Sequence, residues 1–398
     1  MRKLSSSRYV LILITMFCSN TVKANSINSE DIVKIMDKAR DKFDIPAIAV
    51  VTFNSQDFQS KKITGVRRVD SDDQALLEDY FHIGSSAKSI LAVLAGKLVE
   101  DGKITWETKF FDVLPELKDY AREEYYDITL DTLFSCRSGI QPFTSYQELE
   151  ALDEQQRSTK LEFVKYLIGQ PPASDQTDGK FEYLYSNPSY TMVAMMLERV
   201  TDSSWEEIIQ DGLEKKLGLS VMFGWPNAQS AEQPWGHTKV TDEPYSGWLE
   251  VNEEQEFPAD NKKLYAFSPT NEFKLPDLIA PAGDLSMKPL DYARLAQLHL
   301  QGLRGQSNYI LSNTYETIHY KYPVFSYGVG SMESMGEKIS AYSGSAGTFY
   351  AHTMLFPDSD FGYVILINSG SKKAVEGIHW MSSKITKKYF NLWWMFWM

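Results

Sequence analysis

The pattern of apolar residues changes character twice along this chain, and this change constrains the fold more than any other feature. Helical spacing over 32–43 is followed by the continuous apolar run Ala47–Phe53, which predicts a buried strand. Helical patterns and loops occupy about 103–260, strand-like segments return over 325–368, and a helical pattern over 373–388 closes the chain. Strands from both ends need partners, so we predict an α+β fold. Its antiparallel sheet is flanked by helices and built from both chain ends, and it encloses a mostly helical inserted lobe.

The composition is that of a large folded protein, and it argues against several other classes of protein. Of the 398 residues, 43% are hydrophobic and 23% are charged, which is typical of a globular chain and not of a disordered one. The formal net charge of −13 argues against nucleic acid as a partner. We expect a signal peptide at 1–24, a folded domain at 25–390 and a tail at 391–398. Within the domain we expect a sheet lobe at about 25–102 and 265–390, and a helical lobe at about 103–264.

The N-terminal segment has the three parts of an export signal. The first eight residues include three basic side chains, an apolar run covers Tyr9–Phe17, and Val22-Lys23-Ala24 fits the small-x-small cleavage rule. A membrane anchor is the alternative, but the apolar run is about half of the ~20 residues that a spanning helix needs. We therefore expect cleavage after about Ala24 and a periplasmic or secreted protein. Its one remaining thiol, Cys136, cannot form a disulfide within the chain.

The last ten residues, 389–398, are almost all aromatic or apolar. This segment is too short to cross a bilayer. Two interpretations stay open: the tail docks on the folded body, or it makes a peripheral contact with a membrane surface.

The first motif with chemical meaning is Ser85-Ser86-Ala87-Lys88, at the junction of an apolar strand end and a strongly apolar helix. Positions i and i+3 share a face on the first turn of a helix, so the Lys88 amine can reach the Ser85 hydroxyl. A serine hydroxyl needs a base to take its proton, and burial can make lysine such a base. A second match, Ser369–Lys372, lies in a Gly-, Ser- and Lys-rich loop typical of a turn. We therefore expect the nucleophile at Ser85.

Two further elements follow at wide spacing. Tyr185 and Asn187 open a helical pattern; a tyrosine can relay a proton near a cation, and an asparagine can donate to a substrate carbonyl. Tyr342-Ser343-Gly344-Ser345 lies between two late strands. Its glycine lets a substrate approach the strand backbone, and the Ser345 N–H can serve as an oxyanion donor. Each element alone is typical of an ordinary turn, but their order and spacing together indicate one site.

In this order the three elements resemble the serine β-lactamase and penicillin-binding-protein superfamily, and most closely its class C-like branch with Tyr-x-Asn as second motif. Segments 128–140, 217–219 and 280–285 resemble further motifs of that branch. The resemblance implies an acylated serine, a lysine partner and a tyrosine acid/base, with no metal and no organic cofactor. The implied catalytic residues are Ser85, Lys88 and Tyr185, and the implied oxyanion-hole or substrate contacts are Asn187, Tyr342, Ser343, Gly344 and Ser345, with Ser85 N–H as the other oxyanion donor.

Tyr342 departs from the resemblance, because the third motif usually begins with Lys or His. The lysine helps to hold a substrate carboxylate through a charge-assisted hydrogen bond worth about 1.5–3 kcal/mol. We expect the neutral tyrosine to favour neutral substrates. The sequence thus predicts an exported serine hydrolase that acts through an acyl-enzyme on a small ester, amide or peptide, as an esterase or D-peptidase. A class C-like β-lactamase is the alternative, and a catalytically inactive penicillin-binding-like scaffold is the alternative from another class.

Overall fold

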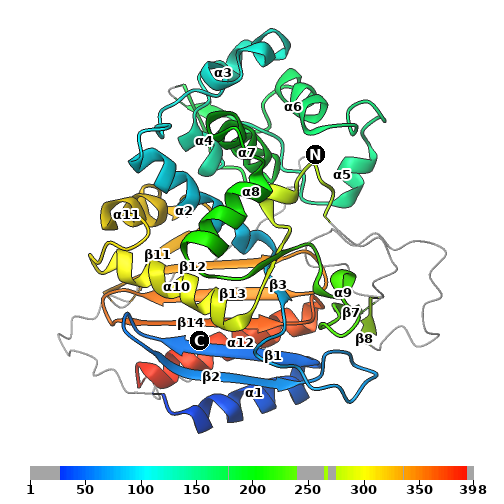
Figure 1. Ribbon diagram of the computed structural model, residues 1–398, viewed down its shortest axis with the longest axis vertical. Coiled ribbons are helices and arrows are strands. Elements are labelled where there is room, and N and C mark those ends of the chain that lie inside the picture. The colour runs from blue at the N-terminus through cyan, green and yellow to red at the C-terminus, as the bar shows by residue number, and fades with distance from the viewer. Residues whose placement is uncertain (1–26, 178, 240–263, 268–274, 335, 392–398) are drawn as a thin grey trace, which may run out of the picture.

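The computed structural model describes residues 27–177, 179–239, 264–267, 275–334 and 336–391. The expected signal peptide and residues 392–398 of the expected tail lie outside them. The described part combines an antiparallel sheet with helices on both sides (Figure 1). Among the described residues, no helix is both long enough and apolar enough to cross a membrane.

The central sheet has seven antiparallel strands in the order β10-β11-β12-β13-β14-β1-β2. β1 pairs with β14 in a register that places Ile48 opposite Ile367, so strands from the two ends of the chain meet in mid-sheet. This confirms the predicted α+β fold with a sheet built from both ends. The strands are β1 (Ala47–Phe53), β2 (Phe58–Gly65), β10 (Val324–Phe325), β11 (Gly330–Ser334), β12 (Glu337–Ser345), β13 (Tyr350–Phe356) and β14 (Phe361–Ile367).

The two faces of the sheet bury separate cores. Ile48 and Val50 of β1 face the core shared with α1 (Ser29–Phe43) and α12 (Lys372–Tyr389). Ala49 and Val51 alternate to the other face, as successive residues of a strand do. That face is covered by α2 (Ala87–Glu100), α10 (Pro289–Leu303) and α11 (Ser312–Tyr320).

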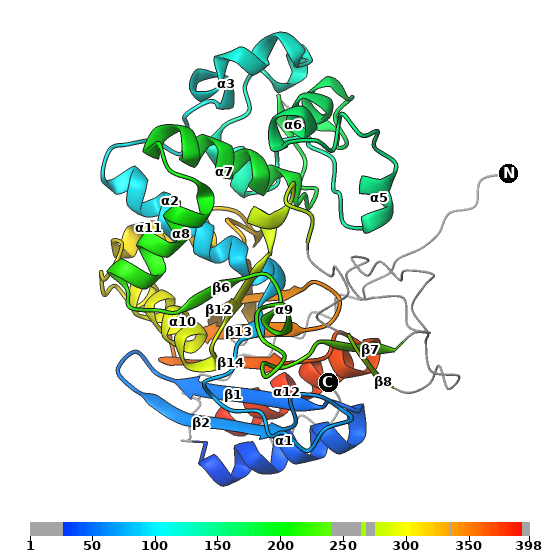
Figure 2. The same cartoon turned by 45° about the vertical axis from the view of Figure 1, so that its right-hand side comes forward.

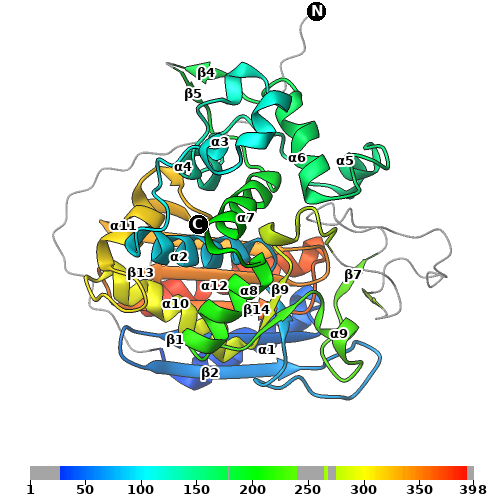
Figure 3. The same cartoon turned by 45° about the horizontal axis from the view of Figure 1, so that its top comes forward.

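Further helices form a layer beyond α2, with α2 lying between α7 and the sheet (Figures 1 and 3). They are α3 (Phe110–Val113), α4 (Leu130–Phe134), α5 (Tyr146–Glu150), α6 (Lys160–Gly169), α7 (Pro188–Thr201) and α8 (Trp205–Gln210). The short α9 (Pro226–Gln229) lies apart from this layer, at one end of the sheet (Figure 1).

Three small sheets complete the described part. β3 (Phe81–His82), β9 (Leu285–Met287) and β6 (Val221–Phe223) form one, and β4 (Gln176–Thr177) with β5 (Lys180–Phe181) another. The third, β7 (His237–Lys239) with β8 (Leu264–Ala266), lies beside α9 (Figure 2).

One strand prediction was wrong. The strand-like stretch that begins at residue 325 was expected to run unbroken to about 330, but the structure ends β10 at Phe325 and begins β11 at Gly330. Between them the chain turns back: Gly328 has φ of +77°, and its N–H donates to the Ser326 carbonyl at 3.0 Å. The apolar residues of this segment therefore form a tight connection between two strands.

Candidate active site

Ser85 lies on a single helical turn, Gly84–Ser86, which joins β3 to the start of α2. Gly84 has a φ of +51°, in the region that favours glycine, and a Cβ there would lie 2.4 Å from the Ser345 nitrogen. A Cβ on Gly344 would lie 2.6 Å from the Ser85 nitrogen. Glycine at both positions therefore allows the turn that carries Ser85 to press against β12, with the backbone of Ser345 beside it.

Lys88 is almost completely buried, with 1% of its surface exposed. Its Nζ lies 3.0 Å from Ser85 Oγ, 2.8 Å from Asn187 Oδ1 and 2.7 Å from the Ala282 carbonyl oxygen. Burial lowers the pKa of this amine to about 7, because it disfavours the charged form. A substantial fraction of Lys88 is therefore neutral at physiological pH.

The hydrogen bonds around Lys88 fix the direction in which a proton can move. A neutral amine has two N–H donors and one lone pair, and the Asn187 and Ala282 oxygens can only accept. Both N–H bonds are thus used on these oxygens, and the lone pair is left for the Ser85 hydroxyl. In this state Lys88 is placed to accept the Ser85 proton.

Tyr185 approaches the same hydroxyl from another side, and its OH donates to Ser85 Oγ at 2.8 Å. Burial raises the pKa of the Tyr185 phenol far above its ordinary value, so this group is protonated at neutral pH. Lys88 Nζ lies 5.0 Å from the centre of the Tyr185 ring. The tyrosine is therefore equipped to give a proton, while the lysine is equipped to take one.

Asn187 is buried directly before α7, and both the oxygen and the nitrogen of its side-chain amide are hydrogen-bonded. Oδ1 accepts from Lys88, and Nδ2 donates to the Phe143 carbonyl oxygen at 2.8 Å. The second bond fixes the amide orientation that presents the oxygen to the lysine. Asn187 also lines the pocket beside Ser85, so positioning Lys88 and contacting a substrate are compatible.

The third motif contributes less to the site than its sequence suggested. Ser345 lines the pocket, but the Tyr342 side chain is 5% exposed and packs into the core, where its ring centre lies 6.1 Å from that of His299. Ser343 alternates to the α12 side of the sheet, and its Oγ lies 2.8 Å from His352 Nδ1. The expectation that the Tyr342 and Ser343 side chains contact substrate is therefore corrected. Successive residues of a strand point to opposite faces of the sheet, so Tyr342 faces one core and Ser343 faces the other.

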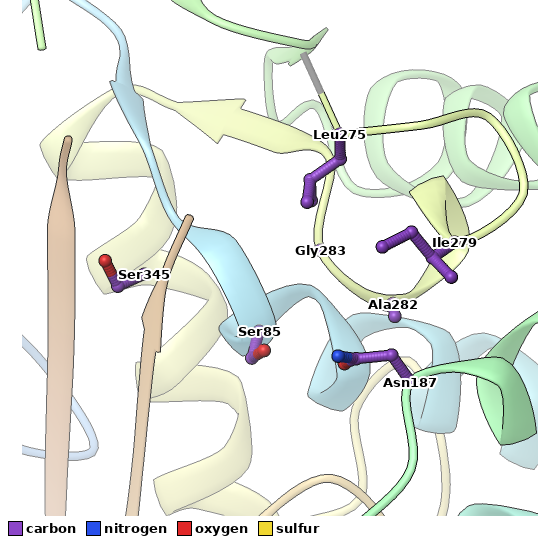
Figure 4. Close-up of a pocket in the computed structure, with 7 residues that line it drawn as sticks. All are labelled: Ser85, Asn187, Leu275, Ile279, Ala282, Gly283 and Ser345. Atoms are coloured by element: carbon purple, nitrogen blue, oxygen red, sulfur yellow. The ribbon is translucent and has the colours of Figure 1, made fainter. Parts of the chain in front are cut away.

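The pocket beside the nucleophile is small and is bordered by Ser85, Asn187 and Ser345 on its polar side. Figure 4 shows Ser85 between Ser345 and Asn187, with a loop opposite that contributes an apolar wall. Sequence reasoning assigned this loop no role in the site, because its residues carry no reactive side chain. The wall residues that it missed are Leu275, Ile279, Ala282 and Gly283.

The second Ser-x-x-Lys segment has no comparable geometry. Ser369 is buried and its Oγ donates to Ser371 Oγ at 3.2 Å. Ser371 caps α12, since its Oγ accepts from the Ala374 N–H, and Lys372 points into solvent. The segment is a helix-capping turn, in agreement with the expectation that it is an ordinary turn.

Neither a metal nor a competing thiol nucleophile is indicated near Ser85. In the described part of the chain, no group of three or more His, Cys, Asp or Glu side chains is placed to hold a metal ion. Cys136 is buried, and burial raises the pKa of its thiol to about 11. At neutral pH it remains a protonated, inaccessible thiol.

Comparison with known proteins assigns most of the chain to one family. A family model described as Beta-lactamase matches residues 32–382. Protein flp from Staphylococcus aureus (strain N315) is 22% identical over 367 residues, which cover 91% of this chain and 68% of that protein.

The solved structures that share this fold include the following two. A class C beta lactamase from Rhodobacter sphaeroides has a TM-score of 0.67 at 17% identity and covers 90% of this chain and 100% of its own. A D-amino acid amidase from Ochrobactrum anthropi SV3, solved with L-phenylalanine, has a TM-score of 0.71 at 15% identity, with 91% and 99% covered.

Proposed function

The chain belongs to the Beta-lactamase family of serine hydrolases, and from that membership we propose that it hydrolyses an ester or amide through an acyl-enzyme on Ser85. One observation carries the proposal. A single hydroxyl, Ser85 Oγ, lies within hydrogen-bond distance of a buried lysine amine and a half-buried tyrosine phenol. Their pKa values are shifted so that one is a base and the other an acid at neutral pH.

In the first step, Ser85 Oγ attacks the substrate carbonyl carbon as its proton passes to the Lys88 lone pair. The N–H groups of Ser85 and Ser345 are the proposed donors to the negative oxygen that forms. The close approach of Gly84 to the Ser345 nitrogen supports this role.

In the second step, the bond to the leaving atom breaks as the Tyr185 hydroxyl gives that atom a proton. The phenolate that results is stabilised by the ammonium of Lys88, and transfer of the proton from Lys88 to Tyr185 restores both groups. Water then attacks the acyl-enzyme by the reverse use of the same groups. It forms the acid and frees Ser85.

The apolar wall of the pocket favours a substrate with an apolar acyl group, because Leu275, Ile279 and Ala282 face Ser85 across the pocket. This wall, and the absence of a lysine from position 342 at the start of the third motif, favour an esterase or D-peptidase over a β-lactamase. The structurally similar protein from Ochrobactrum anthropi SV3 is a D-amino acid amidase, which agrees with the hydrolysis of an amide here.

The test is covalent labelling followed by catalysis. A fluorophosphonate probe should add one label per chain in intact-mass measurements, and Ser85→Ala should remove it while Ser369→Ala retains it. The kcat/KM for p-nitrophenyl butyrate should exceed that for nitrocefin. Preference for nitrocefin by orders of magnitude would identify a β-lactamase, and absence of any label or turnover would identify a non-catalytic binding protein.

Export remains part of the proposal and rests on the N-terminal sequence pattern alone. N-terminal sequencing of the protein recovered from bacterial cells should begin near Asn25. Recovery of the chain from the cytosol with Met1 retained would contradict it.

A further inference from the structure

His82 lies three residues before the proposed nucleophile and is completely buried. It belongs to β3, which pairs with β9 so that His82 lies opposite Ser286. This histidine does not enter the proposed acyl-enzyme chemistry, yet burying a polar ring is costly unless its nitrogens are hydrogen-bonded. Both ring nitrogens have partners, and both partners belong to segments that build the site.

The partners of the two nitrogens select one form of the ring. The Gly84 N–H lies 3.2 Å from His82 Nδ1, and a backbone N–H can only donate, so Nδ1 accepts and carries no proton. Nε2 therefore carries the proton of the neutral ring and donates it to Asp284 Oδ1 at 3.3 Å. A proton on Nδ1 would place two N–H donors against each other. The first bond thus holds the turn that carries the nucleophile.

The second bond leads to the loop opposite Ser85. Asp284 directly follows Ala282 and Gly283, which line the pocket. The Ala282 carbonyl oxygen accepts from Lys88 Nζ at 2.7 Å. A Cβ on Gly283 would lie 3.3 Å from the Ser85 nitrogen, so this loop and the nucleophile turn are in close contact. The imidazole therefore links the segment that carries the nucleophile to the segment that carries an acceptor for the base.

Trp225 supports the imidazole on a third side. The two rings are stacked, with 4.2 Å between their centres and 19° between their planes. Trp225 Nε1 donates to Thr348 Oγ1 at 2.8 Å, and Thr348 lies in the turn that follows Ser345 at the end of β12. The stack and the two hydrogen bonds leave the ring one orientation, in which its nitrogens point at Gly84 and Asp284.

We propose that His82 is a positioning residue whose neutral imidazole sets the distance between the turn of Ser85 and the Ala282 carbonyl. Lys88 bridges that distance, because its amine contacts the Ser85 hydroxyl and the Ala282 oxygen at once. The assignment rests on the proposed acyl-enzyme mechanism. His82 acts on the chemistry through Lys88 and is therefore distinct from the catalytic residues themselves.

Loss of the imidazole should change the basicity of Lys88 in a defined direction. The ammonium form has three N–H donors for the oxygens of Ser85, Asn187 and Ala282, whereas the neutral amine has two. When the Ala282 carbonyl is no longer held, the ammonium form loses a charge-assisted hydrogen bond, and the pKa of Lys88 falls below its value of about 7. The acid limb of kcat/KM should then move to lower pH, while kcat falls because the base is less well aligned.

The groups that face Lys88 do not obscure this titration. They are Tyr185, Tyr190 and Cys136. Burial raises the pKa of all three, that of the Cys136 thiol to about 11, so each keeps its proton from pH 5 to 9. A shift of the acid limb in this range therefore reports on Lys88.

The experiment measures kcat, KM and the pH profile of kcat/KM for p-nitrophenyl butyrate with wild type, His82→Leu and Asp284→Ala. Each variant should lower kcat about 10–100-fold with a much smaller change in KM. Each should also move the acid limb down by about 0.5–1 pH unit. The double variant should shift the limb no further than the single variants do, because both changes break the same link. Additive shifts would overturn the proposal.

A matched control separates this role from the general cost of losing a buried histidine. His319 is also fully buried, and its two nitrogens lie within hydrogen-bond distance of His299 Nδ1 and Ser340 Oγ. His319→Leu should lower the melting temperature and keep the wild-type acid limb. A folded His82→Leu enzyme that does the same would overturn the proposal.

Conservative replacements of His82 separate its two bonds. In His82→Gln the amide nitrogen takes the place of Nε2 and can donate to Asp284, so the acid limb should return toward its wild-type position. In His82→Asn the amide oxygen takes the place of Nδ1 and can accept from Gly84, but the side chain is too short to reach Asp284. This variant should keep the shifted limb.

A measurement on the wild-type chain does not depend on how any variant folds. Nitrogen-15 NMR of labelled histidines, with the His82 ring assigned through its backbone, should show an unprotonated Nδ1 and a protonated Nε2 at neutral pH. A protonated Nδ1 would overturn the proposal. Failure of the proposed function looks different: the wild-type protein turns over no ester and Ser85 takes no fluorophosphonate label.

Discussion

The chain contains two Ser-x-x-Lys segments with the same spacing, and they have opposite environments. At Ser85 the lysine is buried and hydrogen-bonded to the serine. At Ser369 the serine is buried against Ser371 while Lys372 is in solvent. Both serines follow strands and both precede helices, so local structure does not separate them. The difference comes from what surrounds the lysine, because burial makes Lys88 a base whereas water leaves an exposed lysine charged.

The largest expected effect on activity comes from replacing the serine of each segment. Ser85→Ala should lower kcat by about 10⁴-fold or more, because it removes the hydroxyl on which the acyl-enzyme is proposed to form. Ser369→Ala should keep wild-type kcat, although loss of its buried hydrogen bond can lower the melting temperature. Steady-state kinetics and circular dichroism on both variants make the comparison. Loss of activity in the Ser369 variant with an intact fold would reverse the assignment.

The next effect concerns the partners of Ser85. Lys88→Ala and Tyr185→Phe should each reduce kcat by about 10²–10⁴, since one removes the base and the other the acid. Lys372→Ala, at the equivalent position of the second segment, is the control and should change kcat little. A Tyr185→Phe enzyme with nearly normal turnover would show that Tyr185 only packs beside the nucleophile.

The pH dependence sharpens the same comparison. Only neutral Lys88 can accept the serine proton, and its pKa is about 7. The kcat/KM should therefore fall about tenfold for each pH unit below 7 and level off above it, until Tyr185 loses its proton at much higher pH. Rates measured from pH 5 to 9 with a neutral ester test this. A rate that stays flat down to pH 5 would exclude the lysine as the base.

Much of this arrangement follows from the sequence, and the reasons are physical. The strand Ala47–Phe53 and the helix after Ser85 are apolar throughout, so burial and element type agree. The pairing of early and late strands follows because neither group can bury its faces alone. The apolar residues on both sides of the Ser85 motif also distinguish it from the Ser369 motif in the sequence itself.

Other parts depend on atoms that a side-chain pattern does not describe. The second acceptor for Lys88 is the backbone carbonyl of Ala282, which any residue could supply. The strand period places Tyr342 and Ser343 on opposite faces, but it does not say which face meets the pocket. Val324 has a positive φ, and valine gives no local signal for it.

The smallest expected effect is on stability. It tests directly whether burial is the difference between Lys88 and Lys372. The pKa of Lys88 is about 7 in the folded protein and about 10.4 in an unfolded chain. Below pH 7 both states carry the proton, so Lys88 adds no pH dependence. Between pH 7 and about 10.4 the unfolded state binds one more proton than the folded state, and the free energy of unfolding rises with pH by up to about 1.4 kcal/mol per unit. Lys88→Met removes this dependence.

The wild-type protein should therefore gain stability relative to Lys88→Met as pH rises from 7 to 9, whatever the offset between the two at pH 7. That offset combines the stability gained by removing a buried amine with the stability lost with its hydrogen bonds to Asn187 and Ala282. The sign of the offset is therefore not the test. Urea unfolding of wild type, Lys88→Met and the exposed control Lys372→Met at several pH values gives the slopes. Parallel curves for wild type and Lys88→Met would mean that Lys88 has the same pKa in the folded and unfolded protein. The contrast between the two segments would then need another cause.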